Sequence, residues 1–79
     1  MNASLAPAAI HKTHDGLSYT IVLKPDDSTV YLDIDELGLH DHHVHTSCEK
    51  NDWAQLESEG DQAAFTIIDL HNEAPKGLF

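Results

Sequence analysis

Two runs of alternating apolar and polar residues, 17–24 and 29–35, form the clearest pattern in the chain. In both runs every second residue is large and apolar, as with Tyr19 and Ile21 in the first and Leu32 in the second. A repeat of two residues is typical of strands that bury one face. The Pro-Asp-Asp-Ser segment between them favours a four-residue hairpin loop, because proline presets a turn dihedral and Asp and Ser side chains bond nearby backbone.

This hairpin has one register that places all of its large apolar residues on a single face. The predicted pairs are Lys24 with Thr29, Leu23 with Val30, Ile21 with Leu32 and Tyr19 with Ile34. A slip by one residue would turn that face to water, so the pattern specifies the register strongly.

The residues on either side of the hairpin extend the same sheet. Residues 8–13 are expected to form an edge strand, because an Asp-Gly turn signal at Asp15 separates them from the next alternating run. Ile10 then joins the buried face. After the hairpin, residues 36–39 (Glu-Leu-Gly-Leu) are expected to form a turn that returns two leucines to the core.

The C-terminal half contains helix signals followed by a second apolar run. Asp52, with Gln55 three residues later, has the form of a capping box, and Gly60 is a typical C-terminal stop, so a short helix is expected between them. An overlapping start at Thr46 is the weaker alternative. Residues 63–70 are apolar on both faces, which is typical of an interior strand.

These elements predict an α+β fold in the order strand, strand, strand, helix, strand. A mostly antiparallel sheet with one short helix packed on it lets all the apolar runs share one core. The chain is expected to be a single domain, 1–79, with loose ends at 1–7 and 72–79.

The charge of the chain is strongly negative and unevenly distributed. Fourteen acidic residues face four lysines and no arginine, for a net charge of −10, and thirteen of the acids lie between Asp26 and Glu73 with only Lys50 among them. This balance argues against direct binding to nucleic acid or to anionic membranes. The lone cysteine excludes a disulfide scaffold, and no signal peptide or membrane span is evident, so a cytoplasmic protein is expected.

A cluster of histidines is the most unusual chemical feature of the sequence. On a strand, His43 and His45 would point to one side and His40 and His42 would share a side, a spacing that can chelate a metal. Cys48 would add a thiolate, and Asp41 or Glu49 a carboxylate. The candidate site for zinc or another divalent transition metal is His40, His42, His43, His45 and Cys48.

No pattern in the chain points to catalysis. A thiol beside histidines in sequence is not a dyad in space, and no glycine-rich phosphate loop accompanies the acids. We therefore expect a protein that is not an enzyme and that acts without a cofactor, unless the histidine cluster holds a metal.

The remaining interpretation is a binding protein that uses its acidic surface. Carboxylates held on a rigid sheet and helix can imitate a phosphate backbone and occupy the basic groove of a nucleic-acid-binding partner. The candidate partner-binding residues are Tyr31, Asp33, Asp35, Glu36, Glu57 and Glu59. Small size, negative charge and no catalytic motif are typical of viral inhibitors that disarm restriction or CRISPR defence.

Two further expectations accompany this interpretation. The runner-up function is a metal-binding protein that uses residues 40–48. Because a chain of this size buries a thin core, a homodimer or a bound partner is also favoured as a second source of stability.

Overall fold

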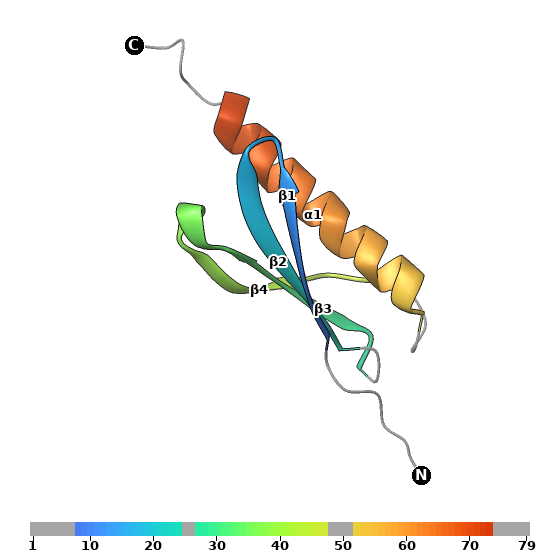
Figure 1. Ribbon diagram of the computed structural model, residues 1–79. Coiled ribbons are helices and arrows are strands. Elements are labelled where there is room, and N and C mark those ends of the chain that lie inside the picture. Colours follow the sequence, from blue (N-terminus) through green and yellow to red (C-terminus); the bar gives the residue numbers. More distant parts are fainter. Residues whose placement is uncertain (1–7, 25–26, 48–51, 74–79) are drawn as a thin grey trace.

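The computed structural model describes residues 8–24, 27–47 and 52–73, which form a four-stranded sheet and one helix. The elements are β1 (Ala8–His14), β2 (Leu17–Lys24), β3 (Thr29–Ile34), a 3-10 helix (Asp35–Leu37), β4 (Leu39–Val44) and α1 (Trp53–Glu73). The strands are antiparallel and lie in the order β1-β2-β3-β4, and α1 crosses one face of the twisted sheet (Figure 1). The expected α+β class, an antiparallel sheet with one helix, is confirmed.

The register of the central hairpin is the predicted one. Lys24 pairs with Thr29, Leu23 with Val30 and Ile21 with Leu32. Every large apolar residue of that face is buried, because the alternation puts all of them on the side that α1 covers. Residues 25–26 lie outside the described part of the chain, so the predicted turn type of this loop is not tested.

The two outer turns also match their sequence signals. Asp15 and Gly16 both have positive φ (49° and 88°), as the two central residues of a type I′ hairpin turn require. Beyond β3, Gly38 has φ 70° and its N–H donates to the carbonyl of Asp35, which closes the 3-10 helix. Leu37 and Leu39 then pack against the core, as expected from the sequence.

The order of the last elements differs from the prediction, which was wrong on three points. The histidine segment forms β4, so the helix follows four strands and not three. Gly60 does not end the helix, which has 21 residues in all and ends at Glu73, and residues 63–70 are helical and not an interior strand. The predicted start is confirmed, because the Asp52 carboxylate accepts a hydrogen bond from the N–H of Gln55 at 3.1 Å. Thr46 lies outside the helix, and its hydroxyl donates to the carbonyl of Ser28.

The missed helix has a buried stripe in which two members are small. Leu56, Gly60, Ala64 and Ile68 are buried and recur every four residues, which places them on one side of α1. Because two of these four positions are a glycine and an alanine and not large apolar residues, the sequence does not show a clear helical repeat of apolar residues. Leu70, which made the run look apolar on both faces, is 63% exposed on the outer side of the helix.

Gly60 marks the closest approach of α1 to the sheet. A Cβ atom added there would lie 2.8 Å from Cγ2 of Ile21 and 3.0 Å from Cγ1 of Val30. Both contacts are to branched side chains fixed at the centre of the core, where neighbouring atoms cannot move aside freely. Only glycine fits this position without displacing the helix.

The core lies between α1 and the covered face of the sheet, and all its buried members in the described residues are hydrophobic. These are Tyr19, Ile21, Leu23, Val30, Leu32, Ile34, Val44, Leu56, Ala64 and Ile68. Among the described helices, none is long and apolar enough to cross a membrane.

Replacing Gly60 by alanine tests this close approach. We expect Gly60→Ala to lower the free energy of unfolding by about 1–3 kcal/mol through overpacking, although alanine favours an exposed helix interior by about 1 kcal/mol. Urea unfolding followed by circular dichroism measures the change.

The matched control is Ser58→Ala, at an exposed position of the same helix. This variant should leave stability unchanged or raise it by a few tenths of a kcal/mol. A Gly60→Ala protein more stable than the natural one would contradict the contact with Ile21 and Val30.

Candidate functional site

Four carboxylates gather where β3 passes into β4, and we call this group the acidic end. Its members are Asp33, Asp35, Glu36 and Asp41. Because Leu37 and Leu39 pack into the core on either side of Gly38, Asp35 and Glu36 remain exposed on the 3-10 helix between strand and turn. The sheet thus holds these carboxylates at one end of the molecule by burying the leucines beside them.

The backbone at the acidic end is fixed by its own side chains. Asp41 has φ 52°, a left-handed conformation that Asp tolerates better than most residues, and its N–H donates to Oδ1 of Asp33 at 2.7 Å. Nδ1 of His40 lies 3.5 Å from Oδ1 of Asp35, both largely exposed. Asp41 was not among the predicted partner-binding residues, because the strand bulge that turns it toward Asp33 has no clear signal in the sequence.

The structure separates the six predicted partner-binding residues into two layers. Tyr31 and Asp33 lie on the face of the sheet that α1 leaves uncovered, opposite Val22 and Thr20 of β2. Asp35 and Glu36 continue from them at the end of β3. Glu57 and Glu59 belong to α1, in the other layer (Figure 1), so they do not join the same surface.

Both helix glutamates are already engaged within the chain. Glu57 accepts an ion-paired hydrogen bond from Nζ of Lys12 at 2.6 Å, at the β1 edge of the sheet. Glu59 accepts bonds from the side chain of Gln55 at 2.8 Å and from the N–H of Ser47 at 3.3 Å. To bind a partner, as expected from the sequence, these two carboxylates would have to give up these contacts.

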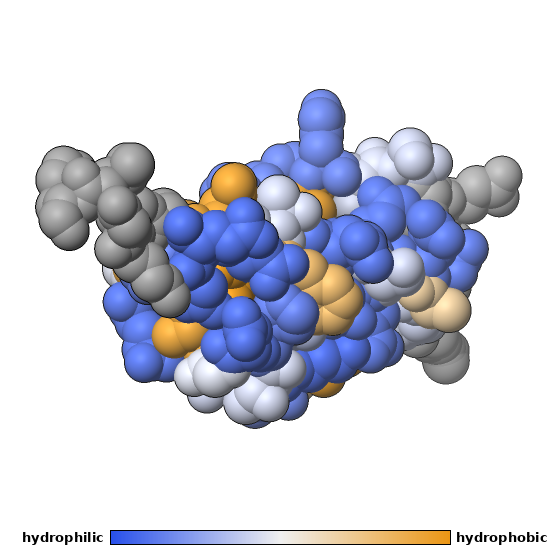
Figure 2. Space-filling view, turned by 90° about the horizontal axis from the view of Figure 1, so that it is seen from above, coloured by the Kyte–Doolittle hydropathy of each residue, from blue (hydrophilic) through white to orange (hydrophobic). Residues whose placement is uncertain are grey.

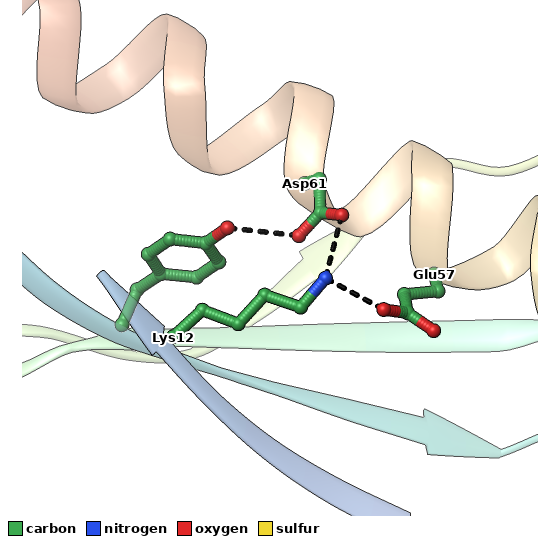
Figure 3. Close-up of polar contacts among 4 residues, drawn as sticks. Lys12, Glu57 and Asp61 are labelled. Atoms are coloured by element: carbon green, nitrogen blue, oxygen red, sulfur yellow. Dashed lines mark hydrogen bonds and ion pairs between the residues drawn. The ribbon is translucent and has the colours of Figure 1, made fainter. Parts of the chain in front are cut away.

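Lys12 is the centre of a polar network that joins β1 and β2 to α1 (Figure 3). Its Nζ lies 2.6 Å from Glu57 and 2.8 Å from Asp61, and the hydroxyl of Tyr19 donates to the other oxygen of Asp61 at 2.8 Å. Lys12 occupies the helix-facing side of β1, beside Ile10 and His14, where a lysine needs an acidic partner. That placement is the signal by which the network could have been found from sequence.

The network changes the acidity of both of its donors. Hydrogen bonds to Asp61 and Glu57 raise the pKa of Lys12, with burial opposing them. Burial, followed by the hydrogen bond to Asp61, raises the pKa of Tyr19 to about 12. The neutral phenol and the charged ammonium are the forms that hold α1 against the sheet.

The described histidines of the cluster do not converge on one point. His43 lies opposite Tyr31, and the ring of His45 is 6.1 Å from that of His43 between centroids, but both histidines also line a groove beside α1, so a common side for this pair stays a prediction. With the register shift between Leu32 and Ile34, His42 lies opposite Leu32 on the helix side, whereas His40 lies beside Asp35. The expected common side of His40 and His42 is therefore wrong, because the bulge interrupts the alternation of the strand.

The candidate metal centre gains no support from this arrangement. Within residues 8–24, 27–47 and 52–73, no three His, Cys, Asp or Glu side chains are grouped so that they hold a metal ion. Cys48 and Glu49, two of the proposed ligands, lie outside the described residues. His42, His43 and His45 line an open groove of about 490 Å³ between β4 and α1. Its other lining residues are Val44, Glu59, Gln62 and Ala63.

The surface of the described residues is mainly polar. Figure 2 shows a face that is mostly hydrophilic, with hydrophobic residues in small separate areas. Of the large hydrophobic residues that the structure describes, Leu70 alone is exposed. Comparison with protein-family models, curated proteins and solved structures gives no match to this chain.

The raised pKa of Tyr19 gives a test of the network. The folded protein keeps the phenolic proton at a pH where the unfolded chain, with an ordinary pKa of about 10, has lost it. The stability that this group contributes is fully present below about pH 10 and is lost as the pH rises toward about 12. We expect the phenolate absorbance of a Tyr31→Phe variant, whose only tyrosine is Tyr19, to titrate near 12.

Asp61→Asn supplies the control for this titration. In the Tyr31→Phe background it should lower the midpoint, because the carboxylate raises the pKa through its hydrogen bond and its charge. Circular dichroism at each pH establishes that the protein is folded. A folded protein whose Tyr19 titrates near 10 would contradict the buried bond to Asp61.

Proposed function

We propose that this chain is a small acidic binding protein, without enzymatic activity, that covers a basic, nucleic-acid-binding surface of a partner protein. The observation that carries the proposal is the acidic end. Its four carboxylates lie within nine residues, 33–41, that contain no lysine or arginine. Carboxylates held close together without a neighbouring cation complement a surface that binds phosphates.

The contrast between the acidic end and the helix supports the choice of this surface. On α1, Glu57 and Asp61 neutralise Lys12, Glu59 binds Gln55, and Asp69 lies 2.8 Å from Nε2 of His14. The carboxylates of Asp35 and Glu36 are exposed, and among the described residues the one pairing recorded for them is between Oδ1 of Asp35 and Nδ1 of His40 at 3.5 Å. A basic partner therefore meets carboxylates that no lysine of the described residues pairs with.

The rigidity of the acidic end favours such binding as well. Asp35 and Glu36 sit on a 3-10 helix whose ends are held by buried Ile34 and by the turn at Gly38. Groups held in place before binding lose little conformational freedom on association. Tyr31, two residues before Asp33 on the same uncovered face, adds an aromatic side chain of the type enriched at binding hot spots.

The proposed partner is a cytoplasmic protein with a basic groove, such as the nucleic-acid channel of a restriction or CRISPR nuclease. A viral inhibitor of such a nuclease would work by occupying the groove in place of DNA or RNA. Electrostatic steering would speed the encounter, and its contribution would fall as salt rises, because exposed charges are screened beyond about 8 Å at physiological ionic strength.

The first test identifies the partner and its binding mode together. Immobilised protein is exposed to a bacterial lysate at low salt, retained proteins are eluted with rising salt and identified, and the capture is repeated with duplex DNA as competitor. We expect a nucleic-acid-binding protein that elutes at moderate salt and is displaced by DNA. Retention that neither salt nor DNA changes would contradict the proposal.

A pair of variants of equal net charge tests the location of the site. Asp35→Lys with Glu36→Lys reverses two exposed carboxylates at the acidic end, and should weaken capture of the same partner by about 100-fold, mainly through slower association.

The control is Asp27→Lys with Glu73→Lys, which makes the same change in net charge at two other exposed positions. This variant should bind within about threefold of the natural protein, as distant surface charges usually allow. Equal loss in both variants would assign binding to overall charge, and the acidic end would not be the site.

A further inference from the structure

The uncovered face of the sheet carries opposite charges at its two ends. Near the β2–β3 loop lies a group that we call the basic half, in which Lys24 and His43 contact Tyr31 and His45 follows beside His43. Toward the other end of the same face lie Asp33 and Asp41 of the acidic end. In a chain with net charge −10, this local basic area is unexpected.

The basic half is held together by direct contacts. Nζ of Lys24 lies 4.7 Å from the centroid of the Tyr31 ring, within the range of a cation–π interaction. The Tyr31 and His43 rings are 5.4 Å apart, and His43 and His45 follow at 6.1 Å. A fixed cation, an aromatic ring and imidazole N–H donors thus form one continuous surface across β2, β3 and β4.

A shallow depression of about 330 Å³ lies between the two halves. Val22 and Tyr31 form its apolar part, while Lys24 and Asp41 carry opposite charges on its rim. No ion pair joins these two rim residues among the described side chains, since Lys24 does not come within pairing distance of any described carboxylate. Within the described residues, neither charge is therefore used in an ion pair inside the chain.

We propose that this uncovered sheet face is the interface of a symmetric homodimer, in which Lys24 and the histidines of one copy lie over Asp33 and Asp41 of the other. A two-fold axis that lies in the plane of the contact, at right angles to the line joining the two ends of the face, exchanges those ends, so the dimer contains two equivalent contacts between a basic half and an acidic half. Val22 and Tyr31, near the middle of the face, become the apolar centre of the contact.

Charge complementarity favours a second copy over other occupants. A uniformly basic partner would be repelled by Lys24 and a uniformly acidic one by Asp33 and Asp41, whereas a second copy presents the reversed arrangement by symmetry. The repulsion between two acidic chains acts over longer distances and is screened by salt, while contacts inside the interface are screened much less. The dimer contact takes Tyr31, Asp33 and Asp41 from the surface proposed for the partner, whereas Asp35 and Glu36 lie past the end of β3 and remain outside the contact.

Sedimentation equilibrium of the full chain tests the dimer, at physiological salt and at protein concentrations up to about 1 mM. We expect a mass that rises toward twice the chain mass of 8.7 kDa. A monomer over the whole range would overturn the proposal.

Charge exchange tests the geometry of the contact. Lys24→Glu alone and Asp41→Lys alone should each weaken the dimer by about 10-fold or more, because each sets like charges against one another at both contacts. An equimolar mixture of the two variants should associate again, as should the doubly exchanged chain. If the mixture remains as weak as the separate variants, this face is not the interface.

A second substitution keeps the test decisive if either charge variant fails to fold. Val22→Lys places a charge at the centre of the face, at a position that is only half-buried, and should abolish the dimer while leaving the circular dichroism spectrum intact. Ser58→Lys, on the exposed side of α1, is the matched control and should dimerise normally. A Val22→Lys protein that dimerises like this control would overturn the proposal.

Discussion

The contact of Gly60 with Ile21 and Val30 determines where the helix lies, and the rest of the structure depends on that position. With no side chain at Gly60, α1 comes close enough to the hairpin to bury Leu56 and Ile68 one and two turns away. The same placement fixes which side chains of the helix face the β1 edge. A helix held further out would lose packing along its whole buried stripe, because dispersion contacts weaken steeply with distance.

The position of the helix also decides which charges of the protein are neutralised. Glu57 and Asp61 are four residues apart, so they lie on one side of α1, and both reach Lys12 from that side. Asp69, two further turns along, meets His14 at the end of β1. Lys12 and His14 of β1 are therefore used to attach the helix, and the carboxylates of Asp35 and Glu36 at the end of β3 take no part in that attachment.

The first three strands could be predicted from the sequence, but only the start of the helix could, for a physical reason that particular residues make clear. In β2 and β3 each buried position is a large apolar residue, so the period of two is visible and the register of Ile21 with Leu32 follows from it. In α1 the closest contacts are made by Gly60 and Ala64, whose value lies in their small size. A residue that is selected because it leaves space resembles a turn signal when the sequence is considered alone.

The candidate site could also be predicted only in part: residues that are neighbours in the sequence could be grouped, but contacts made only in the folded protein could not. The acids at Asp33, Asp35 and Glu36 lie together because they are neighbours along the chain, and their grouping follows from sequence. Glu57 does not join this surface because it pairs with Lys12. The two residues are 45 positions apart in the sequence and meet only because β1 and α1 pack together.

The two ends of the uncovered face place a constraint on how the acidic surface can act. Asp33 and Asp41 share that face with Lys24 and Tyr31, whereas Asp35 and Glu36 project from the 3-10 helix at its margin. If two copies cover Asp33 and Asp41, then Asp35 and Glu36 of each copy remain exposed at the ends of the dimer, related by the two-fold axis. A groove that binds double-stranded nucleic acid meets two phosphate backbones, and a dimer would offer it two separated carboxylate pairs where one chain offers a single pair. Avidity between the two pairs would then strengthen binding without any new contact, provided that their separation matches that of the basic residues in the groove.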